Sequence, residues 1–144
     1  MSSESLSYDR GECLTVLTHA PAEAVREFVE ELLPVLGDVV VLKNRTGLVM
    51  LPYTDSRSGE PFHLGEVLVS EAQVQLDGCE GYGACVGRDN LQALAIAILD
   101  AALASGRMSG QILGFVAQER ERQAEADREL LRMVEATRVE LETF

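Results

Sequence analysis

The chain has 144 residues, a length that fits one domain, and 47% of them are apolar, which is normal for a globular fold and argues against disorder. Its formal net charge is −12, from 24 acidic and 12 basic residues. That balance argues against nucleic-acid binding, because such proteins carry a basic stripe that displaces counterions from phosphates.

The N-terminal part predicts two helices after a flexible start at residues 1–8. Residues 7–20 form a weak helical pattern, and Pro21 then suits the first position of a second helix, where its missing N–H does no harm. The second helix has one apolar face with i, i+3, i+4 spacing, formed by Val25, Phe28, Val29, Leu32 and Leu33. Pro34 disfavours helical geometry in the residue before it, so we expect this helix to end at Leu33.

The middle of the chain predicts four short strands, at residues 39–43, 47–53, 66–76 and 82–86. Residues 44–46 are expected to turn the chain between the first two. Residues 66–76 alternate most clearly, with Leu68, Ser70, Ala72, Val74 and Leu76 on one face. The short connections contain no helix, so the strands should pair as an antiparallel meander.

The C-terminal part predicts two more helices. Asp89 suits an N-cap with Gln92 three residues later, and the helix at 90–105 is apolar on nearly all sides until Gly106 ends it. A long helix follows at about 111–136, with i, i+3 ion pairs in its polar middle. Its apolar quartet, Leu130, Leu131, Met133 and Val134, should dock on the chain's own body or on a partner. We expect residues 136–144 to be extended and to pair with a sheet edge or a partner subunit.

Together these elements predict a single domain over residues 1–144 of the α+β class. The expected architecture is an antiparallel four-stranded meander sheet, with the N-terminal helices and the two C-terminal helices packed largely on one face.

The sharpest candidate site is the segment Gly87, Arg88 and Asp89, where a strand passes through a glycine into a helix N-terminus. Backbone N–H groups and Arg88 meet there, an arrangement that can hold an anion or a partner carboxylate. The alternative is that Asp89 only caps the helix and Arg88 is solvated.

The remaining polar side chains do not predict a catalytic centre. His63 and Glu66 could support acid–base chemistry near neutral pH, but no nucleophile is placed beside them. Cys79 and Cys85 lack the close spacing of zinc ligands, and the odd number of cysteines does not suggest a disulfide framework. The polar N-terminus and the absence of a run of about 20 apolar residues lead us to expect a cytoplasmic protein without a membrane span.

Several segments, taken in order, resemble the PhnG family of phosphonate carbon–phosphorus lyase subunits from about Cys13 onward. They are Thr46-Gly47-Leu48-Val49, Gly59-Glu60-Pro61-Phe62 with Gly65-Glu66, Gly81-Tyr82 through Val86-Gly87-Arg88-Asp89, Ala95 with Leu99-Asp100-Ala101, and Ala136-Thr137-Arg138-Val139-Glu140. The loop at 55–58 and the end of the chain after Glu140 depart from the family pattern.

The resemblance implies an accessory, non-catalytic subunit of a cytoplasmic complex with the H, I and J subunits of the lyase. With I and H, helped by an ATPase-like L subunit, that complex displaces adenine from ATP by a phosphonate and forms ribose 1-phosphonate 5-triphosphate. A later radical step on J, using an iron–sulfur cluster and S-adenosylmethionine, breaks the carbon–phosphorus bond. No catalytic residue, metal or cofactor is therefore assigned to this chain, and ATP is used by the complex. Gly87, Arg88, Asp89, Thr137 and Arg138 are the expected contact residues.

Two other interpretations remain open. A stand-alone small-molecule enzyme or anion binder could use Arg88, His63 and Glu66. A self-associating module is the other, since an isolated subunit can cover a vacant interface by forming a homodimer.

Overall fold

The fold comes from a computed structural model that describes residues 8–54, 59 and 61–142, with side chains undescribed at 51–54, 61–64 and 138–142. The predicted α+β class and antiparallel meander are confirmed, but the number of strands is wrong, because the described residues form a three-stranded sheet in the order β1-β2-β3. In chain order the elements are α1 (Arg10–His19), α2 (Ala22–Leu36), β1 (Val40–Thr54), β2 (Pro61–Leu76), β3 (Cys79–Val86), α3 (Asn90–Ser105) and α4 (Ser109–Glu142).

The strand count differs because the two strands expected at 39–43 and 47–53 are one strand, β1. The turn expected at residues 44–46 does not form, since Asn44, Arg45 and Thr46 pair in register with Ala72, Glu71 and Ser70 of β2. The long alternating β2 thus provides partners across the whole segment, and this pairing outweighs the local turn preference.

The helix α2 continues past Pro34, where we expected it to stop. Proline removes one backbone donor but leaves the rest of the last turn intact, and Gly37 ends the helix with its N–H donating to the carbonyl of Leu33. The extra turn buries Leu36, which is 1% exposed. Burial of a leucine is worth about 2 kcal/mol, comparable with the proline penalty.

The helix α3 lies directly on the sheet, against the face of β2 formed by Ser70, Ala72, Val74 and Leu76, which are buried as their alternation predicted. Gly81 and Gly83 of β3 permit this close approach. A Cβ at Gly83 would lie 2.4 Å from the carbonyl oxygen of Ala93, and one at Gly81 would lie 2.3 Å from the backbone of Ala101. The nearly all-round apolar character of α3 therefore reflects burial on most of its sides, although Leu91 near its start is 59% exposed.

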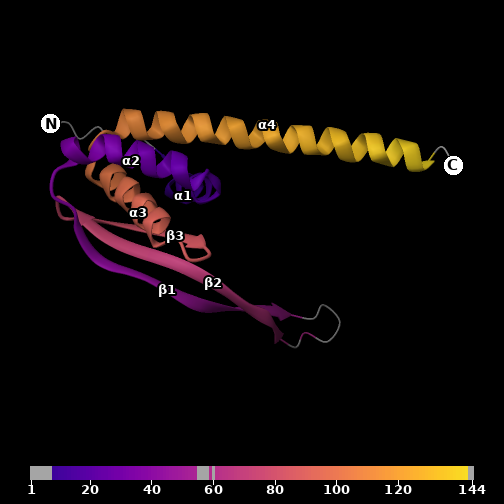
Figure 1. The fold of residues 1–144 in the computed structure, drawn as a ribbon, viewed down its shortest axis with the longest axis horizontal. Coiled ribbons are helices and arrows are strands. Elements are labelled where there is room, and N and C mark those ends of the chain that lie inside the picture. Colours follow the sequence, from indigo (N-terminus) through magenta and orange to yellow (C-terminus); the bar gives the residue numbers. More distant parts are fainter. Residues whose placement is uncertain (1–7, 55–58, 60, 143–144) are drawn as a thin grey trace.

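The other helices form further layers on the same side of the sheet (Figure 1). α1 and α2 pack on α3, and the first turns of α4 pack on α1 and α2, where the rings of Phe28 and Phe115 stack with centroids 4.3 Å apart. The opposite face of the sheet carries no helix among the described residues. The predicted one-sided arrangement is thus confirmed.

Two parts of the chain project beyond these layers (Figure 1). We call the outer part of β1 and β2, with side chains described at 47–50 and 65–69, the hairpin arm. We call residues 127–137 of α4 the helix arm. The extended segment expected at 136–144 is wrong for its described residues, because α4 continues as a helix to Glu142. No Gly or Pro follows Gly114, and the segment is rich in helix-forming Glu, Leu and Arg.

Candidate functional site

The predicted site lies at the junction between β3 and α3, where backbone groups hold the turn in place. Gly87 has φ +102°, a conformation that favours glycine. Its N–H donates to the carbonyl of Leu68 at 2.7 Å, and its own carbonyl accepts from the Ser70 hydroxyl at 2.7 Å. The glycine therefore ties the start of α3 to the centre of β2.

A short chain of hydroxyl and amide groups continues this network across the sheet. The Thr46 hydroxyl on β1 donates to Asn90 Oδ1 at 2.8 Å and lies 2.9 Å from the Ser70 hydroxyl. Three elements thus meet at the N-terminus of α3 through side chains that already bond one another. Sequence reasoning did not identify Thr46, Ser70 or Asn90 as part of this cluster, because strand pairing brings them together.

Asp89 caps α3 as predicted, with its Oδ1 accepting from the backbone N–H of Gln92 at 2.9 Å. Arg88 is exposed, and within the described residues the structure gives its guanidinium no ion pair. The positive end of the helix and the Arg88 charge lie beside a cap that already supplies a carboxylate. Arg88 therefore stays a predicted contact residue.

The other two predicted contact residues lie elsewhere. Thr137 is exposed on the helix arm, where its hydroxyl donates to the carbonyl of Met133 at 3.0 Å. Arg138 belongs to the same helix, but its side chain lies outside the described ones. Figure 1 shows the far end of α4 well separated from the start of α3, so these two residues and Gly87–Asp89 belong to different surfaces.

The candidate acid–base residues lie on the hairpin arm. Glu66 is exposed and pairs across the hairpin with Met50, while His63 pairs with Pro52 and its side chain is outside the description. The β3–α3 junction lies close to Glu66 along β2. Gly87 donates to the carbonyl of Leu68, which is two residues after Glu66 in that strand.

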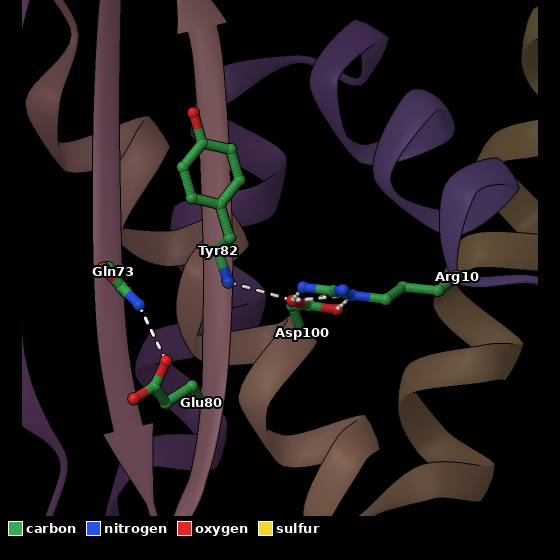
Figure 2. Close-up of polar contacts among 5 residues, drawn as sticks. All are labelled: Arg10, Gln73, Glu80, Tyr82 and Asp100. Carbon is green, nitrogen blue, oxygen red and sulfur yellow. Dashed lines mark hydrogen bonds and ion pairs between the residues drawn. The ribbon is translucent and has the colours of Figure 1, made fainter.

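Among the side chains that the structure describes, the most buried charged group is one that sequence reasoning did not select, Asp100 in α3. It is 2% exposed and accepts three times from Arg10 of α1, at 2.8, 3.0 and 3.2 Å, and once from the backbone N–H of Tyr82, at 2.9 Å (Figure 2). The Asp100 carboxylate raises the pKa of Arg10 through these bonds. The sequence did contain a signal for this cluster, namely a single carboxylate inside an apolar helix. A charge that is buried in this way needs a partner.

The Asp100 cluster has a structural role, because it links α1 to α3. It also accepts a backbone N–H from the outer edge of β3, the edge that faces away from β2. All four bonds to Asp100 come from the protein itself, so the carboxylate is already satisfied without a substrate.

The solvent face of the sheet carries a second polar group of residues. Lys43 and Arg45 of β1 both approach Glu71 of β2, at 3.9 and 3.6 Å, and Gln73 donates to Glu80 at 2.8 Å (Figure 2 shows this last pair). These groups are partly exposed. They are a solvated surface in the isolated chain.

The cysteines are free thiols, and Cys13 and Cys85 are buried. Burial raises the pKa of both thiols above its ordinary value, which leaves them protonated and unreactive at neutral pH. Within the described residues, no three His, Cys, Asp or Glu side chains gather in a way that could hold a metal ion. None of the helices in that same part of the chain combines the length and the apolar character that crossing a bilayer requires.

Two of the surface hollows on the described part of the chain border α2. The larger, about 500 Å³, lies between α2 and the first turns of α4, with Phe28 and Phe115 in its wall. The smaller, about 160 Å³, is an apolar groove between α2 and α3 lined by Leu33, Leu91 and Ile98 among others. Neither of these two hollows is lined by Gly87, Arg88 or Asp89.

Comparison with known proteins places this geometry in context. The family described as "Phosphonate metabolism protein PhnG" matches residues 8–144. A subunit named PhnG of the alpha-D-ribose 1-methylphosphonate 5-triphosphate synthase of Rhizobium meliloti is 36% identical over 100 residues, covering 69% of this chain and 64% of the relative. HtxH of Stutzerimonas stutzeri, named as a C–P lyase subunit, is 38% identical over 87 residues, covering 51% of this chain. The match spans 23% of HtxH, so that relative is much longer than the region they share.

Proposed function

Because the chain belongs to the PhnG family of phosphonate metabolism proteins, we propose that it is a subunit of a carbon–phosphorus lyase complex and performs no bond-making step itself. The names of the two relatives, a synthase subunit and a C–P lyase subunit, support an assembly as the working form. The proposed partners are the H, I and J subunits of that lyase, in the cytoplasm.

One structural observation carries the proposal, namely the apolar surface on the two arms. Leu130, Leu131, Met133 and Val134 on the helix arm are between 55% and 62% exposed. Leu48, Val49 and Met50 on the hairpin arm are between 47% and 63% exposed. Apolar residues grouped in this way on a protein surface mark an interaction site more often than a solvated one.

At this exposure the quartet is not covered by the described part of the chain's own body, and we propose a partner as its covering surface. Three i, i+3 ion pairs along α4 (Glu119–Arg122, Glu125–Arg128 and Glu129–Arg132), all predicted from the sequence, help to hold the helix. Such pairs stabilise a helix in water but do not shield leucines from it.

The name of the Rhizobium relative gives a product of this kind, and we propose the following reaction for the complex. An oxygen of the phosphonate bonds to C1′ of the ATP ribose, the bond from that carbon to adenine breaks, and ribose 1-phosphonate 5-triphosphate forms. The Asp100 carboxylate, which already bonds only protein groups, favours a non-catalytic role for this chain in that reaction. The chain would shape the site or hold its catalytic partners in place.

Size-exclusion chromatography of the chain mixed with its purified H, I and J partners tests the proposal. We expect co-elution in one complex, with the chain absent from the position of its free form. Elution as a separate and unaltered species would contradict it. Turnover of ATP with methylphosphonate by this chain alone would instead support an independent enzyme that uses Arg88, His63 and Glu66.

A further inference from the structure

The two outer edges of the sheet differ in how far other parts of the chain cover them. On β3, the N–H of Tyr82 points away from β2 and donates to the buried Asp100 carboxylate, so this edge is covered by α3 and α1. On β1, at the other end of the order β1-β2-β3, no strand or helix pairs with the outer edge within the described residues. An uncovered edge presents backbone N–H and C=O groups that can accept another strand.

The open part of this edge has defined limits. The pairing of β1 with β2 is irregular between Val41 and Lys43 and again between Leu51 and Pro52. Irregularities and proline are devices that prevent edge pairing, and here they flank the segment without interrupting it. Between them residues 43–51 pair regularly with β2, a length that suits one added strand.

The outer part of this segment, residues 48–50, is apolar on both faces. Leu48 and Met50 lie on one face of the ribbon and Val49 lies on the other. All three side chains are about half exposed or more. Their partners across the hairpin include Leu68 and Val67. Strands with apolar residues on both faces are typical of the interior of a sheet.

At the start of the segment two positive side chains share one negative partner. Lys43 and Arg45 share one carboxylate, that of Glu71, at 3.9 and 3.6 Å, and both cations are substantially exposed. The free edge of β1 thus has an excess of positive charge on a chain whose net charge is −12. A further carboxylate on an incoming strand would complete the ion pairs.

We propose that residues 43–51 of β1 accept an extended segment of a partner subunit as a fourth strand. That segment carries an acidic side chain opposite Lys43 or Arg45 and apolar side chains beside Leu48 and Met50. Its main-chain bonds supply affinity, and the charge and the apolar side chains supply register. This inference rests on the proposed function and identifies the surface through which the subunit is held.

A second copy of this chain fits the edge less well. Two β1 strands would bring the Lys43 and Arg45 cations of both copies into one interface without a new carboxylate. The copies would also carry −12 each, and like charges oppose association. A dimer built through β1 in the purified chain would therefore overturn the proposal.

Hydrogen–deuterium exchange on the full chain, free and in complex with its H, I and J partners, tests the inference directly. We expect amides at residues 43–51 that face outward to exchange about tenfold more slowly or better in the complex, because they gain main-chain bonds. Amides of α3, already protected by burial, should change little. A complex that forms without protection of 43–51 overturns this inference and leaves the proposed function standing, whereas failure to form any complex contradicts both.

A pair of charge reversals gives an independent readout. Arg45→Glu places a carboxylate where we expect one from the partner, and the affinity for the complex should fall by about tenfold or more. Arg122→Glu is the matched control, because Arg122 is similarly exposed (60% against 65%), also pairs with one glutamate, and lies outside both arms. Equal affinities of the two variants, with circular dichroism showing both folded, would overturn the proposal.

Discussion

The helix α3 and the helix arm of α4 contain similar apolar residues but differ in what surrounds them. In α3, Ile96, Leu99 and Ala101 are fully buried between the sheet and the outer helices. On the helix arm every described residue is exposed. The first helix is held by packing and the second by its own propensity and ion pairs. Apolar residues on the arm therefore contribute little to folding, and their presence points to a covering partner.

The largest expected contrast comes from truncating one leucine in each region. Leu99→Ala removes a side chain that is 0% exposed and should lower the free energy of unfolding by about 3–4 kcal/mol, since a cavity remains in the core. Leu131→Ala removes one that is 62% exposed and should change it by less than about 0.5 kcal/mol. Urea denaturation measures both. Similar losses would show that the arm packs on the body.

A second contrast compares two strand glycines. Gly83→Ala puts a Cβ 2.4 Å from the carbonyl oxygen of Ala93, which forces α3 away from the sheet and should destabilise the chain by roughly 3 kcal/mol. Gly47→Ala on the hairpin arm meets no atom within 4 Å and should be neutral or slightly stabilising. Thermal unfolding distinguishes them. Tolerance of Gly83→Ala would contradict the close seating of α3.

A third contrast compares two ion pairs. Asp100→Ala leaves the Tyr82 N–H without an acceptor and separates Arg10 from α3, so we expect a loss of about 2 kcal/mol. Glu129→Ala breaks an exposed pair with Arg132 on the helix arm, which should matter by less than about 0.5 kcal/mol. Both values come from denaturant titration. An equal effect of the two substitutions would indicate that Asp100 does not hold α1, α3 and β3 together.

The smallest expected effect is a dependence on alkaline pH that is confined to the body. Burial raises the pKa of the Cys13 and Cys85 thiols above 9.0 in the folded chain. The folded state then holds protons that the unfolded state has lost, so stability is fully present below about pH 9 and falls as the pH rises through the folded pKa values. Unfolding titrations from pH 8 to 10 should show this slope, and Cys85→Ala should reduce it. A slope that Cys85→Ala leaves unchanged would assign the effect to other groups.

Local patterns predicted much of the body correctly. The alternation of β2, the cap at Asp89, the end of α3 at Gly106 and the three ion pairs of α4 each depend on residues within a few positions, and all are confirmed. The errors arose where a distant partner decided the outcome. Pairing with β2 straightened residues 44–46, and burial of Leu36 carried α2 past Pro34.

The candidate site shows the same limit. The glycine, arginine and cap at 87–89 could be located from sequence, but the hydroxyl cluster of Thr46, Ser70 and Asn90 depends on strand register and could not. Asp100 was visible as a lone charge in an apolar helix, yet its partner Arg10 is ninety positions away. The uncovered edge of β1 is a property of sheet order, which no local pattern reveals.

The central claim is that this chain supports partner proteins and contributes little reactivity of its own. Release of adenine from ATP in the presence of methylphosphonate, measured with the H, I and L subunits and with or without this chain, tests it most directly. We predict that the reaction proceeds when the chain is included, is lost when it is omitted, and is absent with the chain alone. Unchanged release after omission, or release by the isolated chain, would contradict the account.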